Sequence, residues 1–374
     1  MKEIIKTNVA YHGRKVGSIL LDPTGKKCVF EYEKSWIADG FSLSPIELPL
    51  QKGLFVADEN YLNGAFFIFE DSMPDGYGLY LLNKMLNNQG LSLAELSPLQ
   101  RLSLVGSSGM GALEYSPATL STTSMLSVED VDFDDLQSRA LDIFSEKSLT
   151  DPSFLYYNSR NSGGARPKVV FKDRDGSSWI AKFRHVYDPE DAGIMDYRYM
   201  KVAELCGIKV PKSGLIKGKY FVCRRFDVED GVRLHTATAA ALLKTDFRAQ
   251  TADYTNILAL TGYLTQDPAQ VEQMFRLMVF NIVSLNKDDH AKNFSFIYRE
   301  PTGWELAPAY DLTFSPEGTR GEHSTSIMYK GNPSLEDVLK AGTGIRIPKK
   351  QCLEIIEEIQ AVCGKELDRT ENLL

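Results

Sequence analysis

Short apolar runs alternate with turn residues over the first part of the chain. Residues 4–11, 16–21 and 28–32 are rich in β-branched and aromatic side chains, and glycine, proline and aspartate separate them. This pattern is typical of strands joined by turns. Apolar residues at helical spacing follow over residues 78–88. Residues 1–115 are therefore predicted to form a small α+β subdomain.

A polar stretch separates this subdomain from the rest of the chain. Residues 116–135, SPATLSTTSMLSVEDVDFDD, have the bias toward serine, threonine and aspartate that is typical of a connection. A connection is predicted over residues 116–150. The pattern then changes to NSGGARPK, VVF, KDRDG and SSWIAKF, which predicts a glycine loop followed by a strand hairpin.

The remaining pattern is mostly helical. Apolar residues at helical spacing predict a helix over residues 191–206, and Gly207 is placed to cap its C-terminus. The sequence KYFVCRRFD predicts a further strand, and helical patterns follow toward residue 374. Two further parts are predicted: residues 151–228, with the glycine loop and the hairpin, and the helical residues 229–374.

Composition limits the class of protein. A chain of 374 residues with 43% hydrophobic residues can bury a large core, and its length favours more than one folding unit. The net charge of −8 disfavours binding of nucleic acid through a broad basic face. The five cysteines form no CxxC pair, so neither a zinc site nor a disulfide framework is predicted, and a reducing compartment is favoured.

Hydrophobic runs give no sign of a membrane or export segment. No run approaches the roughly 18 apolar residues that a membrane-spanning helix needs. The first residues, MKEIIKTNVAYHGRKVG, lack the apolar stretch of a signal peptide. A cytoplasmic protein without a membrane partner is expected.

One polar cluster lies between two apolar runs. The stretch NKDDHAKNFSF, residues 286–296, follows MFRLMVFNIVSL and continues as the apolar run FSFIY. A solvated loop is the plain alternative, but burying unpaired charges is costly, so core elements on both sides favour a function for these side chains. Asn293 stands five residues after Asp288, and Asp311, in LAPAYDLTF, follows eighteen residues later.

This spacing is typical of a phosphoryl-transfer site. A kinase needs a carboxylate to accept the proton of the attacking hydroxyl, an amide oxygen on a metal ion, and a second carboxylate on Mg²⁺. Asp288, Asn293 and Asp311 supply these groups in that order. Mg²⁺ prefers hard oxygen ligands and keeps several waters, so two protein ligands and phosphates suffice.

Three neighbours of these residues remain to be assigned. Lys292 is predicted to place positive charge against the transferred phosphoryl group, and His290 to orient the catalytic loop by hydrogen bonding. A transition-metal site at Asp289 and His290 is disfavoured, because adjacent residues point apart in regular elements and the other histidines form no matching cluster.

The glycine loop supplies candidates for the phosphates of ATP. Gly163 and Gly164 allow backbone N–H groups to approach an anion closely, and Arg166 or Lys168 adds positive charge. Lys182, in the second strand of the hairpin, is the predicted ligand of the α- and β-phosphates, because a strand lysine after a glycine loop is the protein-kinase arrangement. The alternative for Lys182 is an outward-facing strand lysine.

Other glycine-rich sequences fit nucleotide motifs less well. No GxxxxGK[ST] sequence occurs in the chain, which disfavours a P-loop NTPase. The cluster VGSSGMGALEY, residues 105–115, lacks the strand, helix and acidic residue of a dinucleotide-binding site. A packing turn is predicted there.

Five motifs in order resemble one protein family. They are DSMPDGYG at 71–78, VGSSGMGALEY at 105–115, NSGGARPK at 161–168, RRFDVEDGVRLH at 224–235, and DDHAKNFSF with LAPAYDLTF. Together they resemble the HipA-type serine/threonine kinases, the toxins of bacterial HipBA toxin–antitoxin pairs. The DxHxxN pattern is also similar to the catalytic loop of phosphatidylinositol kinases, so a small-molecule or lipid kinase stays open. A binding protein on a decayed kinase scaffold is the non-enzyme alternative, which the intact motif residues disfavour.

The resemblance to HipA-type kinases implies a fold, a reaction and partners. The fold is an α+β, two-lobed protein-kinase-like fold with a mostly helical C-lobe and an N-terminal α+β subdomain. The cofactors are ATP and Mg²⁺, and the substrate is a protein serine, in known cases on an aminoacyl-tRNA synthetase, whose modification arrests growth. The partner is a helix-turn-helix antitoxin of HipB type, and DNA is bound only through it.

The resemblance also implies residue roles. Asp288 is the catalytic base, with Lys292 and His290 beside it, and Asn293 and Asp311 bind Mg²⁺. ATP is bound by Lys182, Gly163, Gly164, Ala165 and Lys168, and by the backbone at Arg224 and Phe226. Ser162 is the expected autophosphorylation site, although the family's serine usually stands one position earlier, at Asn161 here. Arg224 replaces an acidic residue that is frequent in the family, which a backbone contact to adenine tolerates.

Overall fold

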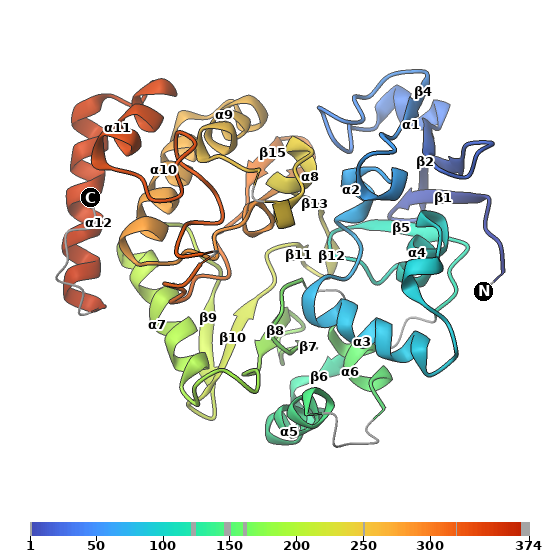
Figure 1. Ribbon diagram of the computed structural model, residues 1–374, viewed down its shortest axis with the longest axis horizontal. Helices are drawn as coiled ribbons and strands as arrows, with labels where there is room; N and C mark the ends of the chain where they lie inside the picture. The colour runs from blue at the N-terminus through green and yellow to red at the C-terminus, as the bar shows by residue number, and fades with distance from the viewer. Residues whose placement is uncertain are drawn as a thin grey trace. The chain divides into compact units, whose positions relative to one another are not determined.

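The computed structural model describes residues 2–120, 125–145, 151–159, 163–249, 251–318 and 320–367. The chain divides into two units, one of Met1–Glu190 with Val222–Ala237 and the other of Asp191–Phe221 with Thr238–Leu374. Within the described ranges, no helix is both long enough and apolar enough to span a bilayer. Figure 1 labels the elements of each unit.

The first unit begins with an antiparallel sheet. Its strands lie in the order β4-β3-β2-β1-β5. The strands are β1 Lys6–Tyr11, β2 Arg14–Leu21, β3 Cys28–Tyr32, β4 Leu54–Val56 and β5 Leu113–Ser116. Val9, Ile19 and Phe30 are fully buried on the sheet. These strands confirm the ones predicted at residues 4–11, 16–21 and 28–32. They could be predicted because turn residues stand at the ends of each apolar run.

Helices accompany this sheet in the first unit. The elements are α1 Lys34–Asp39, η1 Leu62–Gly64, α2 Phe67–Glu70, α3 Gly76–Asn87, η2 Leu93–Glu95 and α4 Pro98–Val105. Helix α4 begins at a capping box in which Ser97 and Gln100 exchange side-chain-to-backbone hydrogen bonds. Helix α3 covers the stretch predicted as helical at residues 78–88.

A second sheet of the first unit contains the predicted hairpin. In the first unit, the strands of this sheet lie in the order β6-β7-β8-β10. Strand β6 is parallel to β7, and the other neighbours are antiparallel. The strands are β6 Leu126–Ser127, β7 Lys168–Lys172, β8 Ser178–Lys182 and β10 Tyr220–Arg224. Lys168 and Lys182 are cross-strand partners in β7 and β8. The remaining elements are η3 Val128–Asp130, α6 Ser153–Ser159, β11 Val228–Glu229, β12 Val232–Arg233 and β13 His235–Thr238.

The stretch predicted as a connection contains a helix, α5 Phe133–Phe144. The side chain of Asp132 accepts hydrogen bonds from the backbone N–H groups of Asp134 and Asp135 and caps the helix. Its buried residues stand at helical spacing, and they are Phe133, Leu136, Ala140 and Ile143. The acidic residues that suggested a connection therefore cap and solvate an amphipathic helix.

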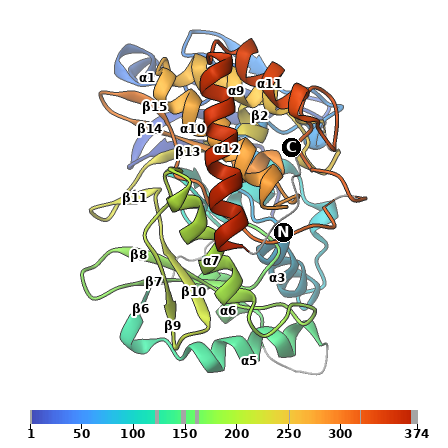
Figure 2. The same cartoon turned by 90° about the vertical axis from the view of Figure 1, so that its left-hand side faces the viewer.

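The second unit is mostly helical. Its elements are α7 Ala192–Leu205, β9 Ser213–Ile216, α8 Ala239–Leu243, η4 Phe247–Ala249, α9 Tyr254–Thr265, α10 Pro268–Val283, η5 Ala291–Asn293, β14 Ser295–Arg299, β15 Gly303–Leu306, α11 Leu335–Gly344 and α12 Lys349–Glu366. Helix α10 packs between α9 and α12, and α12 also contacts α7 and α11 (Figures 1 and 2). The helix predicted over residues 191–206 is confirmed by α7.

Candidate active site

The polar cluster of the sequence forms a loop between two buried elements. Helix α10 buries every residue from Leu277 to Val283, and β14 buries Ser295, Phe296 and Ile297. Between them, Asp288 is exposed, whereas Ala291 and Phe294 are buried. The loop therefore presents Asp288 to solvent from an anchored backbone.

Asn293 folds back on Asp288 within this loop. Its Nδ2 donates a hydrogen bond of 2.8 Å to the backbone carbonyl of Asp288, and its backbone N–H donates one of 2.8 Å to the carbonyl of His290. Because the amide nitrogen is engaged, the amide oxygen is the atom of this side chain that would bind a cation. An amide oxygen and a carboxylate are the hard oxygen donors that Mg²⁺ prefers.

Asp311 is tied to the same loop through its neighbour Tyr310. The Tyr310 hydroxyl donates a 2.6 Å hydrogen bond to the carbonyl of Lys292 and lies 2.6 Å from Oγ of Ser295. Asp311 itself has a φ of 57°, in the left-handed region that residues other than glycine rarely adopt. Such backbone conformations cluster at functional sites, where the surrounding structure holds them.

The left-handed backbone of Asp311 predicts a difference between two substitutions. We expect Asp311→Gly to be more stable than Asp311→Ala by about 1 kcal/mol, because glycine adopts this conformation without a Cβ penalty. Equilibrium unfolding of both variants in urea measures the difference. Equal stabilities would contradict the left-handed conformation at this position.

Asp289 is bound by hydrogen-bond donors from distant parts of the chain. Its side chain is fully buried and accepts hydrogen bonds from the Tyr254 hydroxyl (2.8 Å), His323 Nδ1 (2.8 Å), and the backbone N–H groups of Ser324 (2.9 Å) and Thr325 (3.3 Å). Sequence reasoning considered Asp289 only as a metal ligand and overlooked this role. Its partners lie 34 to 36 residues away in sequence, so no local pattern indicates them.

A chain of buried amides extends this network. Asn281, on α10, donates from Nδ2 to the Tyr254 hydroxyl at 2.9 Å, and Asn286 donates to Asn281 Oδ1 at 3.0 Å. Burial, and next the charge of Asp289, raise the pKa of Tyr254 well above its ordinary value. Tyr254 therefore stays protonated and donates to the Asp289 carboxylate.

His290 and Lys292 pack against one aromatic ring. The Phe247 ring lies 5.4 Å from the His290 ring, centroid to centroid, and 4.9 Å from the Lys292 ammonium, a cation–π distance. Nδ1 of His290 is buried and has no hydrogen-bond partner among the residues that the structure describes. The histidine that bonds to the acidic motif is instead His323.

The glycine loop of the first unit is held by the DSMPDGYG motif. The carboxylate of Asp75 accepts a 2.6 Å hydrogen bond from the N–H of Gly164, and the N–H of Tyr77 donates to the Gly164 carbonyl at 2.9 Å. A Cβ at Gly76 would lie 2.4 Å from that carbonyl oxygen. Gly163 and Gly164 have φ values of 65° and 80°, so the turn requires glycine.

Basic side chains surround this loop in the first unit. The Lys168 ammonium donates to the carbonyl of Gly163, and Lys182 is the cross-strand partner of Lys168. Arg166 forms a bidentate pair with Asp188, at 2.8 and 3.1 Å. Burial raises the pKa of the Asp188 carboxyl, but the hydrogen bond from Arg166 and further contacts hold it below its ordinary value. Ala165 is exposed.

The RRFD motif contains a buried ion pair. Arg225 binds Asp227 through two hydrogen bonds, at 2.9 and 2.5 Å, and their side chains are 5% and 2% exposed. Burial raises the pKa of the Asp227 carboxyl, but the charge of Arg225, its hydrogen bond to Asp227 and hydrogen bonds from backbone N–H groups together hold this pKa below its ordinary value. Arg224, which precedes the pair, and Phe226, which lies between its two members, are half-buried.

The VGSSGMGALEY motif packs on this same segment. The N–H of Gly111 donates to Asp227 at 3.3 Å, and the Arg233 guanidinium donates to the carbonyls of Ser107 and Gly109 at 2.8 and 3.0 Å. The glycine cluster thus forms a packing turn, as its sequence predicted. Ser162 and Asn161, the candidates for autophosphorylation, lie outside the described residues, so that modification stays a prediction.

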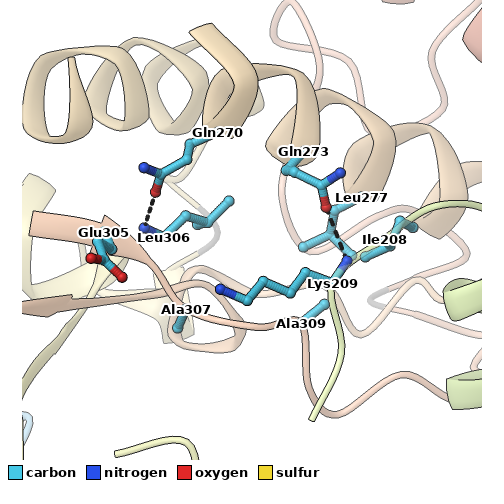
Figure 3. A pocket seen from close by; sticks show the side chains of 9 residues that line it. All are labelled: Ile208, Lys209, Gln270, Gln273, Leu277, Glu305, Leu306, Ala307 and Ala309. Atoms are coloured by element: carbon cyan, nitrogen blue, oxygen red, sulfur yellow. Dashed lines mark hydrogen bonds between the residues drawn. The ribbon is translucent and has the colours of Figure 1, made fainter. Parts of the chain in front are cut away.

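Figure 3 shows a pocket elsewhere in the second unit. Its volume is about 190 Å³, and Gln270 and Gln273 of α10 line it with Lys209 and Glu305. Gln270 accepts a hydrogen bond from the Leu306 N–H at 2.7 Å, and Gln273 accepts one from the Lys209 N–H at 2.9 Å. The predicted site residues do not line this pocket.

Grouped ligands for a transition metal do not occur in the described ranges, where no three His, Cys, Asp or Glu side chains gather around one point. Asn293 and Asp311 therefore remain predicted ligands of Mg²⁺, an ion that keeps several waters and needs few protein ligands.

Known proteins provide an independent comparison. Residues 161–366 match the HipA-like C-terminal domain, and residues 7–116 match the HipA N-terminal domain. The serine/threonine-protein kinase toxin HipA of Shewanella oneidensis is 23% identical over 336 residues, which cover 79% of this chain and 72% of that relative. The putative kinase Y4dM of Sinorhizobium fredii is 26% identical over 205 residues, which cover 50% of this chain and about half, 48%, of that relative.

A solved structure extends the comparison to the fold. The solved complex of HipA, HipB and operator DNA from Shewanella oneidensis MR-1 contains a similar chain. The alignment covers 98% of this chain and 91% of that chain. The TM-score is 0.72 at 18% sequence identity. The predicted α+β, kinase-like fold of HipA type is thereby confirmed. Because the HipA-like C-terminal domain matches more than half of this chain, the chain belongs to the HipA family.

Proposed function

We propose that the protein is a Mg²⁺- and ATP-dependent serine/threonine protein kinase that arrests growth as the toxin of a toxin–antitoxin pair. The observation that carries the proposal is the loop in which Asp288 is exposed while Asn293 binds the Asp288 carbonyl. A protein kinase uses this combination, with a second carboxylate such as Asp311, for phosphoryl transfer.

Each residue of the loop has a proposed task. Asp288 accepts the proton of the substrate hydroxyl as that oxygen attacks the γ-phosphorus, and the bond from this phosphorus to the β,γ-bridging oxygen breaks to release ADP. Lys292, whose ammonium lies over Phe247, places positive charge near the transferred group. Asn293 Oδ1 and the Asp311 carboxylate would hold Mg²⁺, which would neutralise phosphate charge. His290 is proposed to support the loop from its packed position beside Phe247.

The first unit supplies the proposed ligands of ATP. Lys182 binds the phosphates, and the backbone of Gly163, Gly164 and Ala165 covers them, with Lys168 supporting the loop through the Gly163 carbonyl. The backbone at Arg224 and Phe226 contacts adenine. This assignment is supported by the buried Arg225–Asp227 pair, which fixes the segment in which both residues lie.

The proposed partners are proteins. The substrate is a component of translation such as an aminoacyl-tRNA synthetase, and a helix-turn-helix antitoxin of HipB type neutralises the toxin. The solved complex of the Shewanella HipA with HipB and operator DNA supports this partner. The net charge of −8 agrees with DNA contact made through the antitoxin.

We expect Mg·ATP to raise the melting temperature of the protein and Lys182→Ala to reduce that rise. A ligand that binds only the folded state at a hundred times its Kd adds about 2.7 kcal/mol of stability. Differential scanning fluorimetry with millimolar Mg·ATP measures the shift. Lys172→Ala, an exposed lysine of β7, is the matched control and should keep the full shift. A well-folded protein without any shift would contradict ATP binding.

The substrate class needs a separate experiment. Phosphoproteomics of cells that express either the wild-type chain or Asp288→Ala should find phosphoserine or phosphothreonine sites only with the wild type. Labelled inositol lipid without labelled protein would instead favour a lipid kinase.

A further inference from the structure

Asp288 and Asp289 are adjacent but face opposite environments. Asp288 is exposed, whereas Asp289 is 1% exposed. A buried carboxylate is costly unless hydrogen-bond donors replace its water. Four donors surround Asp289, from Tyr254, His323, Ser324 and Thr325. The energetic cost of burying this charge is offset by bonds to distant parts of the second unit.

The backbone around Asp289 is bound by the same segment. Ser324 donates to the carbonyl of Lys287 from both its N–H and its hydroxyl, each at 3.0 Å. The Thr325 hydroxyl donates to the carbonyl of Asp289 itself at 2.5 Å. Residues 287–289 are therefore held on both sides of Asp288, by side chain and by main chain.

The holding segment is in turn anchored to the start of α9. The N–H of Tyr254 donates to the carbonyl of Ser326 at 2.8 Å, and the N–H of Ser326 donates to the carbonyl of Ala252 at 3.1 Å. Tyr254, which bonds to the Asp289 carboxylate, belongs to this same anchor. The contacts close a ring that joins the α9 start, residues 323–326 and the catalytic loop.

We infer that Asp289 is a positioning residue, whose buried carboxylate sets the direction in which Asp288 presents its own carboxylate to the substrate. The expected effect of Asp289 on the reaction rate rests on the proposed kinase function. Its expected effect on the position of the loop does not depend on that function. A displacement of about 1 Å at a reacting group can lower a rate a hundredfold. A residue that only orients Asp288 changes turnover more than ATP affinity.

The first test is Asp289→Asn in the full chain. This change keeps the size of the side chain but replaces one acceptor oxygen with an NH₂ group that faces donors. We expect kcat for ADP release from Mg·ATP to fall by about 10- to 100-fold, with the KM for ATP unchanged. A folded Asp289→Asn protein with wild-type kcat would overturn the inference.

Asp337→Asn is the matched control. Asp337 is also buried, at 4% exposure, and accepts hydrogen bonds from Lys330 and Ser334 at the start of α11. It should lose stability on substitution but retain kcat. An equal loss of kcat in Asp337→Asn would show a general effect of removing a buried charge and would overturn the inference.

His323 gives a rescue experiment. His323→Ala removes the Nδ1 donor to Asp289, whereas the Nδ2 of His323→Asn takes nearly the same place. We expect His323→Asn to recover most of the kcat that His323→Ala loses. Equal losses in the two variants would contradict a role through the hydrogen bond.

Hydrogen exchange tests the positioning without any activity. In Asp289→Asn, peptides that cover residues 286–293 and 323–326 should exchange faster, whereas α12 should not change. Unchanged exchange in these peptides would overturn the inference even in an active enzyme. If the wild-type chain transferred no phosphate, the kinase proposal would fail, and the exchange result would still decide the role of Asp289 in the loop.

Discussion

Replacing Asp288 with alanine is expected to lower phosphoryl transfer about a thousandfold or more and to leave the protein folded. Single catalytic groups contribute on this scale because they act on the transition state. The fold is expected to survive because the Asp288 side chain is exposed, and the bond from Asn293 goes to its backbone carbonyl, which alanine retains. Initial rates with radiolabelled ATP, measured at saturating nucleotide, give the loss in kcat.

The control for Asp288→Ala is an acidic residue of the same unit that lies far along the chain. Glu357 is exposed on α12, so Glu357→Ala should transfer phosphate at the wild-type rate. Circular dichroism spectra and melting temperatures of both variants should match those of the wild type. Transfer by Asp288→Ala within tenfold of wild type would remove Asp288 from the role of base.

Replacing Asp227 with alanine is expected to destabilise the first unit by about 3–5 kcal/mol. The change leaves the Arg225 guanidinium buried without its counter-charge, which is the costly situation for an ion pair inside a protein. It also removes the acceptor of the Gly111 N–H. Urea titrations followed by circular dichroism measure the change in the free energy of unfolding.

Two comparisons sharpen this prediction. Lys15 and Glu33 form an exposed pair at 2.8 Å in the same unit, so Lys15→Ala should cost less than about 1 kcal/mol. The double variant Arg225→Met/Asp227→Leu should recover most of the stability, because two apolar side chains leave no buried charge. An Asp227→Ala protein as stable as Lys15→Ala would show that the buried pair contributes little.

Local patterns in the sequence were sufficient for the first three strands, the hairpin and helices α3 and α7, and they indicated that the polar loop of residues 286–293 lies between two buried elements. The strands of residues 6–32 are bounded by turn residues, and α7 carries apolar residues at helical spacing and a glycine after its last turn. Helix α5 was not predicted, because its acidic first turn resembles a polar linker when read without the core that it covers.

Contacts between distant residues were beyond the reach of such patterns. The partners of Asp289 come from α9 and from residues 323–325, and no spacing rule connects these segments. Arg166 was a candidate phosphate ligand by composition, but it is paired with Asp188, 22 residues later. Long-range hydrogen bonds of buried polar groups depend on the tertiary fold, whereas strand and helix periodicity depends on neighbours in sequence.

The contact between Asp75 and Gly164 bears on how fragments of the chain behave. The matched C-terminal domain begins at residue 161, yet the glycine loop in it is bound by residues 75–77, which belong to the same structural unit. A truncated protein that starts at residue 161 would lack the acceptor of the Gly164 N–H and both partners of the Arg233 guanidinium. Division of the chain at the family boundary therefore cuts through a structural unit, and fragments that contain the glycine loop need the N-terminal residues as well.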